Sequence, residues 1–115
     1  MSAFTQESLD RLTQLLGEVS ARPMFGGYGF YRNDRIFGCV MRDDLYLKTD
    51  DQTRDTFLAA GAKQMTNDVV QKHTNRRMSM PYYLADPQAD HFAGWVQLAV
   101  AAAERSSSKA KKGKG

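Results

Sequence analysis

The residues best suited to chemistry lie in ARPMFGGYGFYR, residues 21–32, where glycines alternate with aromatic side chains. A glycine-rich loop binds a dinucleotide when G-x-G-x-x-G follows a strand and opens a helix. Gly27 and Gly29 fill the first two glycine positions, but Arg32 stands at the third and the next residues have the pattern of a strand. A phosphate-binding P-loop is also excluded, because no Gly-Lys-Ser/Thr follows. We therefore interpret the stretch as the entry into a β-sheet, in which Gly26 and Gly27 turn the chain from a helix and Gly29 leaves room on a strand.

The remaining residues of catalytic type do not form a recognisable site. His73 and His91 are far apart and do not have a metal-binding spacing such as H-E-x-x-H. Cys39 is the single cysteine and lies in an apolar run, which favours a small core residue over a nucleophile. The acidic pairs at 43–44 and 50–51 suit a turn and a helix cap. The sequence predicts no catalytic or metal-ligating residue and no cofactor, and hence a protein that is not an enzyme.

The basic residues are concentrated at one end. The formal net charge is +3, but residues 104–115 hold five of the 16 basic residues and one of the 13 acidic ones, so residues 1–103 have a net charge of −1. We expect residues 104–115 to be a disordered basic tail after a single domain at 1–103. Weak, salt-sensitive contact with nucleic acid is the associated hypothesis. Its candidate residues are Arg76, Arg77, Lys109, Lys111, Lys112 and Lys114.

Composition places the chain among ordinary globular proteins. Its 115 residues suit one domain, and no apolar run approaches the roughly 20 residues of a membrane span. The first residues, MSAFTQESLDRL, lack the basic start and apolar stretch of a signal peptide. We therefore expect a cytoplasmic protein that does not bind a membrane.

The first half of the chain reads as one helix followed by a three-stranded meander. Apolar residues recur at steps of three and four in residues 5–19, which predicts a helix capped by Thr5. Residues 28–49 then alternate as three strands, with tight turns at Asn33–Asp34 and Asp43–Asp44. In the middle strand the pattern places Ile36, Gly38 and Val40 on one face and Phe37, Cys39 and Met41 on the other.

The second half predicts two helices and one or two strands. A short helix follows an Asp cap at 50–51 and stops at Gly61, and a strand near 78–83 contains Pro81, which indicates a sheet edge. A further short strand fits either 63–65 or 69–71. The last helix is expected to begin at an Asp86 cap with Pro87 in its first turn and to bury the stripe Phe92, Val96, Ala99 and Ala103. The fold class is therefore α+β, a largely antiparallel sheet with helices packed on it.

Three ordered blocks together resemble one family. RPMFGGYGFYRNDRIFG, DDLYLKTDDQTRDTFLAAGA and MSMPYYLADP, with the alanine-rich last helix, are similar to the N-terminal domain of TfoX/Sxy, bacterial regulators associated with DNA competence. The resemblance covers residues 19–103. It implies a compact α+β domain like the secretion-chaperone fold, regulation by partner contact, and no catalytic residues. Full-length members carry a second, C-terminal domain, whereas this sequence continues into SSSKAKKGKG, so we expect a stand-alone N-domain.

Three functional hypotheses follow. The leading one is a non-enzymatic regulatory or protein-interaction domain with an unidentified partner; the others are a nucleic-acid-associated protein and a small-ligand-binding protein. The positions that match the family blocks are expected to build the fold and part of a surface: Arg22, Met24, Phe25, Gly26, Gly27, Gly29, Tyr31, Tyr46, Lys48, Tyr82 and Tyr83. Among them we expect Arg22, Tyr46 and Lys48 to be exposed, because their polar tips need water or a partner. The partner's identity and the oligomeric state stay open.

Overall fold

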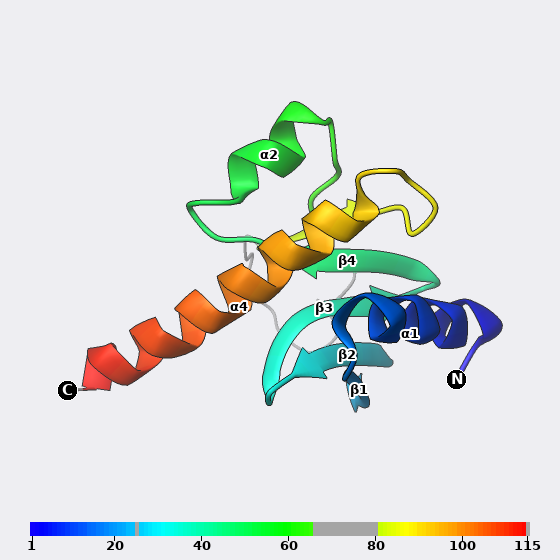
Figure 1. The fold of residues 1–115 in the computed structure, drawn as a ribbon, viewed down its shortest axis with the longest axis horizontal. Helices are drawn as coiled ribbons and strands as arrows, with labels where there is room; N and C mark the ends of the chain where they lie inside the picture. Colours follow the sequence, from blue (N-terminus) through cyan, green and yellow to red (C-terminus); the bar gives the residue numbers. More distant parts are fainter. Residues whose placement is uncertain (25, 66–80, 115) are drawn as a thin grey trace.

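A computed structural model describes residues 1–24, 26–65 and 81–114, with side chains as far as residue 106. In chain order the elements are α1 (Ala3–Leu16), β1 (Ser20–Met24), β2 (Gly27–Arg32), β3 (Arg35–Met41), β4 (Asp44–Lys48), α2 (Arg54–Ala59), β5 (Tyr82–Ala85) and α4 (Phe92–Lys114). The strands form one antiparallel sheet in the order β1-β2-β3-β4-β5. Helices α1 and α4 both cross the same face of it (Figure 1). The predicted α+β class is confirmed.

The meander has four strands, one more than the pattern predicts. The added strand, β1, contains Pro23, which cannot donate to a ladder and is tolerated because β1 lies at the sheet edge. Gly26, with φ +83°, turns the chain from β1 into β2, while Gly17, with φ +88°, ends α1. The glycines at 26 and 27 therefore serve a hairpin, and the prediction that they lead from a helix into the sheet is wrong.

The predicted turn at Asn33–Asp34 is confirmed, and the one predicted at Asp43–Asp44 lies one residue earlier, at Arg42–Asp43. Asn33 and Asp34 have φ of 54° and 64°, and Arg42 and Asp43 have φ of 53° and 60°. Consecutive left-handed residues are the requirement of a two-residue hairpin turn whose twist matches its strands. Asn and Asp tolerate this backbone better than other residues with a side chain. Asn33, Asp34 and Asp43 therefore mark the two turns in the sequence, whereas Arg42 does not.

A β-bulge corrects the predicted faces of β3. The register shifts between Phe30 and Tyr31: Phe30 pairs with Gly38 but Tyr31 pairs with Ile36, which leaves Phe37 as an extra residue. The alternation therefore breaks at that point. As a result Phe37 packs in the same core as Val40, and Ile36 lies on the opposite face with Cys39.

The core beneath the helices is large and aromatic. Leu12 of α1, Phe57 of α2 and Phe92 of α4 are all fully buried there with the sheet residues Phe30 and Leu47. The predicted stripe of the last helix is confirmed, since Phe92, Val96, Ala99 and Ala103 are all buried. Phe57 lies 4.1 Å from Trp95, ring centroid to ring centroid.

Helix boundaries differ from the predicted caps. The hydroxyl of Ser2, not Thr5, caps α1 by accepting from the Thr5 backbone N–H at 3.1 Å. Asp86 accepts from the Gln88 backbone N–H in a turn, and α4 begins only at Phe92. Gly61, with φ +78°, follows α2 as expected. Helix α4 also passes the predicted boundary at residue 103 without a break.

The last strand is the edge that Pro81 indicated. Beyond β5, Gln64 forms an isolated bridge with Tyr83, and the Met65 backbone N–H donates to the Tyr82 carbonyl at 2.8 Å. The predicted strand at 63–65 therefore exists as a single bridge. Its alternative at 69–71, and residues 78–80 of the predicted strand, lie outside the described residues.

Candidate functional site

Most of the residues that match the family blocks share one face of the sheet, opposite α1 and α4. Partners in an antiparallel ladder point to the same side, and the register pairs Arg22 with Gly29, Tyr31 with Ile36 and Lys48 with Tyr82. We call this the motif face. Its members from the family blocks are Arg22, Met24, Gly27, Gly29, Tyr31, Tyr46, Lys48 and Tyr82. Residues from four strands are thus brought to one side of the sheet.

Two glycines let the strands of the motif face lie close together. A Cβ on Gly27 would stand 2.0 Å from the Val40 carbonyl oxygen, a distance at which the backbone itself has to move. A Cβ on Gly29 would stand 2.8 Å from the Met24 Sδ, which is the flexible end of a side chain. Gly27 is therefore required by backbone packing, whereas Gly29 makes room for side chains.

The centre of the motif face is buried. Cys39, Met41, Tyr46, Met65 and Tyr82 form a second apolar cluster. Burial raises the pKa of the Cys39 thiol to about 12, so it stays protonated at neutral pH and is no nucleophile. Burial also raises the pKa values of Tyr46 and Tyr82. Tyr46 is only 9% exposed, so the expectation that it reaches solvent is wrong. Its ring packs in this second cluster instead.

At the edge of the motif face an arginine is held at the surface. The guanidinium of Arg22 lies 4.3 Å from the centroid of the Tyr31 ring, and its Nη2 donates to Asp34 Oδ1 at 2.7 Å. The side chain of Arg22 is still 50% exposed, as the sequence predicts. We call these three residues the Arg22 cluster.

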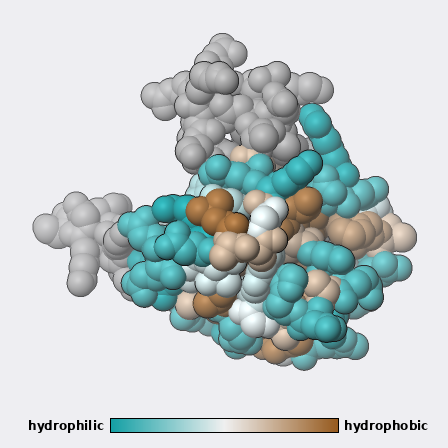
Figure 2. Space-filling model, turned by 90° about the horizontal axis from the view of Figure 1, so that it is seen from above, coloured by the Kyte–Doolittle hydropathy of each residue, from teal (hydrophilic) through white to brown (hydrophobic). Residues whose placement is uncertain are grey.

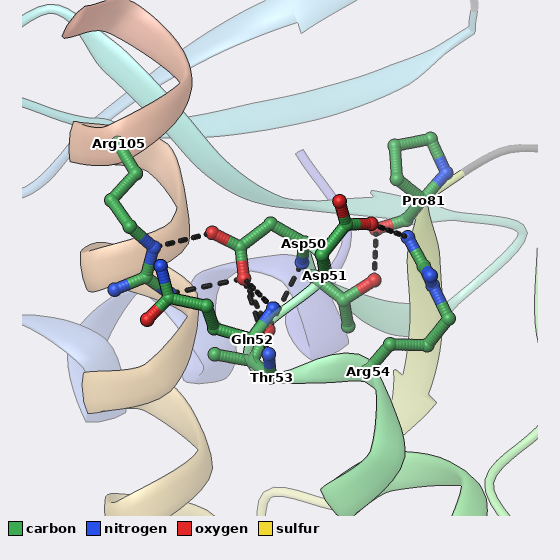
Figure 3. A network of polar contacts seen from close by, with 8 residues as sticks. Asp50, Asp51, Gln52, Thr53, Arg54, Pro81 and Arg105 are labelled. Atoms are coloured by element: carbon green, nitrogen blue, oxygen red, sulfur yellow. Dashed lines mark hydrogen bonds and ion pairs between the residues drawn. The ribbon is translucent and has the colours of Figure 1, made fainter. Parts of the chain in front are cut away.

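Beyond the end of β4, on the side of α4, lies a polar network that the sequence did not reveal. Asp50 follows β4 and accepts from Arg105 of α4 through both carboxylate oxygens, at 2.5 Å from Nε and 3.0 Å from Nη2 (Figure 3). The same carboxylate accepts from the backbone N–H groups of Gln52 and Thr53. These bonds, the one from Arg105 first, lower the pKa of Asp50 to about 2. No local pattern links residues that are 55 positions apart.

Lys48 borders this network beside an open hollow of about 360 Å³. Burial lowers its pKa, and its Nζ lies 5.9 Å from the Tyr82 ring centroid. Arg54 pairs with Asp51 at 3.2 Å, as Arg105 pairs with Asp50. A volume of this size would admit a small ligand, but both arginines of the hollow already have a carboxylate. The network ties α4 to the turn after β4 rather than offering free donors.

The other predicted residues do not join these sites. Tyr83 points to the helix face, 6.0 Å from Phe57 between ring centroids. Gly26 lies in a turn, and His91 stacks on Trp95 at 4.2 Å. Outside the described part of the chain lie Phe25, His73, Arg76 and Arg77, and the side chains of Lys109, Lys111, Lys112 and Lys114.

The described residues contain neither a cluster of metal-binding side chains nor a membrane-spanning helix. Among them no three His, Cys, Asp or Glu side chains gather closely enough to hold a metal ion. None of the helices in the same part of the chain combines the length and apolar character needed to cross a membrane.

Comparison with known protein families assigns most of the chain to a family. Residues 10–103 match the family described as the TfoX N-terminal domain. No curated protein matched the chain. The matched range runs from the middle of α1 to the buried part of α4, so it contains every strand of the sheet and the Arg22 cluster.

Proposed function

Because this chain belongs to the TfoX N-terminal domain family and is thus a competence-regulator-like domain, we propose that it is a non-enzymatic regulatory domain that works by contact with a protein partner. The proposal rests on the Arg22 cluster. It extends to the surface formed by β1 and the β2–β3 turn, and it does not depend on the identity of the pathway.

Within the Arg22 cluster, the exposed guanidinium is held in a position from which it can contact a partner. An exposed ion pair contributes little to stability, roughly 0–1 kcal/mol, so Arg22 adds little to the fold through Asp34. The ring of Tyr31 and the carboxylate of Asp34 nevertheless hold the guanidinium in one place. Arginine and tyrosine are enriched among residues that dominate binding energies, and a fixed side chain loses less entropy on binding.

The chemistry-bearing groups elsewhere are used by the fold, which supports a role without catalysis. The Cys39 thiol is buried and protonated, and the Asp50 carboxylate is engaged by Arg105. On the side of α2, away from β1, apolar residues lie in small patches among hydrophilic ones (Figure 2).

The test is affinity capture from bacterial lysate with quantitative mass spectrometry. We expect proteins captured by the wild-type chain to lose at least about tenfold in enrichment with Arg22→Ala, because one dominant interface side chain is worth at least about 2 kcal/mol. Arg11→Ala is the matched control, since Arg11 is an exposed arginine on α1, and we expect it to retain capture. Equal capture by wild type and Arg22→Ala would contradict the proposed surface.

A further inference from the structure

Two arginines that flank the β2–β3 turn lack, in the described part of the chain, the carboxylate partners that Arg22, Arg54 and Arg105 have. Arg32 and Arg35 are directly opposite each other in the antiparallel ladder. Both are partly buried, and the Nε of each is buried without a hydrogen-bond acceptor among the described residues. Like charges directly opposite each other on a sheet are destabilising. The pair is therefore costly to the fold as it stands.

Their position on the helix face follows from the register. Tyr31 and Ile36 lie on the motif face, so the next residue outward on each strand points to the other side. Arg32 reaches the end of α1, where its Nη2 donates to the Leu16 carbonyl at 3.4 Å. This long bond uses one of five donors of the guanidinium. The side chain of Arg35 makes no hydrogen bond or ion pair with any described residue.

The nearest acidic side chain of the hairpin does not neutralise the pair. Asp34 is the only acid in the β2–β3 turn, and it is paired with Arg22 at 2.7 Å. By contrast, Arg54 and Arg105 each contact an aspartate. Two guanidinium groups without a carboxylate thus start from neighbouring strands, on the same face of the sheet, with opposing Cβ atoms about 5 Å apart.

We propose that Arg32 and Arg35 bind a phosphate group, either inorganic phosphate or a phosphate ester. A carboxylate has two oxygens and is satisfied by one guanidinium fork, whereas a tetrahedral phosphate has enough oxygens to accept from two arginines at once. Bound phosphate would offset the repulsion between the two cations and accept from their outer Nη groups. The site lies outside the Arg22 cluster, so its failure would leave the proposed partner surface untouched.

The first test compares thermal unfolding of the full chain in phosphate and in chloride at equal pH and ionic strength. At about three times the dissociation constant, phosphate is expected to raise Tm of the wild type by roughly 3 °C. Arg35→Gln should lose this rise, while Arg11→Gln, on exposed α1, should keep it. If wild type shows no rise, or Arg35→Gln shows the same rise, the assignment is wrong.

A second readout covers the case in which Arg35→Gln does not fold. Phosphate is titrated into the ¹⁵N-labelled wild-type chain, and the arginine Nε–H resonances are followed. We expect those of Arg32 and Arg35 to shift together with one dissociation constant, and that of Arg11 to stay in place. Shifts of similar size at every arginine would mean general screening and would overturn the site.

A third arm identifies the source of the phosphate. Binding to a labelled DNA duplex is measured by fluorescence anisotropy across a salt series. If the site takes a backbone phosphate, Arg35→Gln lowers affinity and reduces the salt slope by about one. If DNA binding is unchanged while the phosphate-dependent rise in Tm is lost, the site takes a free phosphate or a small phosphate ester.

Discussion

The two faces of the sheet achieve close packing in opposite ways. Under α1, α2 and α4 the helix face is filled by large side chains such as Phe30, Phe57 and Phe92, all fully buried. The motif face depends on missing side chains, because Gly27 lets backbone approach backbone. The helix face is thus sensitive to lost volume and the motif face to added volume. Arg22 lies exposed at the edge of the motif face, where neither constraint applies.

Removing volume from the helix face should have the largest effect. Phe57→Ala is expected to lower the free energy of unfolding by about 3–5 kcal/mol, because a fully buried ring leaves a cavity. Leu58→Ala is the matched control, since the neighbouring Leu58 is 51% exposed, and it should change stability by less than about 0.5 kcal/mol. Urea unfolding measures both. Similar losses for the two variants would mean that α2 is not packed as described.

Adding volume to the motif face should have the next largest effect. Gly27→Ala is expected to cost about 1–3 kcal/mol, because its methyl group would meet the Val40 carbonyl oxygen. Gly94→Ala adds the same atom in α4, where nothing lies within 4 Å, and should stabilise by roughly 0.5–1 kcal/mol. Thermal unfolding measures both variants. A lower Tm for Gly27→Ala with a higher Tm for Gly94→Ala would support the comparison, and Tm changes in the same direction would refute it.

The Asp50–Arg105 network, which ties α4 to the turn after β4, should give a pH-dependent effect. The pKa of Asp50 is lowered to about 2 from a usual value of 3.8, so its contribution is present above pH 4 and is lost as the pH falls toward 2. Because both side chains are partly exposed to water, we expect about 1 kcal/mol. Asp50→Asn should flatten the stability profile between pH 4 and pH 2 relative to wild type. The control Asp90→Asn, on an exposed turn residue, should leave that profile unchanged.

The Arg22 cluster should give the smallest effect on stability. Arg22→Ala is expected to change the free energy of unfolding by less than about 0.5 kcal/mol, because the ion pair with Asp34 is exposed. The same variant should lower the enrichment of captured partners at least about tenfold, so the two measurements together separate a role in binding from a role in folding. A large loss of stability in thermal unfolding would instead assign Arg22 to the fold.

What the sequence predicts here depends on whether the signal is local. The turns at Asn33–Asp34 and the stripe from Phe92 are readable because neighbouring residues alone determine them. Strand β1 was missed because Pro23 argues against a strand unless its place at an edge is known. The bulge at Phe37 breaks the alternation without any glycine or proline to mark it.

The candidate sites were harder to predict than the fold. Arg22 and Lys48 could be selected because they match family blocks, but Asp50 and Arg105 meet across 55 positions. Arg35 stands out because its buried Nε has no hydrogen-bond partner among the described residues, and this depends on three-dimensional packing. No pattern in the sequence separates it from the paired arginines at 54 and 105.

The order of the elements also has a consequence for the growing chain. Strands β1 to β4 are consecutive hairpins completed by Lys48, but much of their helix-side cover comes from α4, whose buried stripe ends at Ala103. Synthesis of the intervening 55 residues takes roughly 3–11 s at ordinary translation rates. During that interval Phe30, Leu45 and Leu47 lack the cover of this helix, so the emerging chain presents apolar surface that is prone to aggregation until α4 has been made.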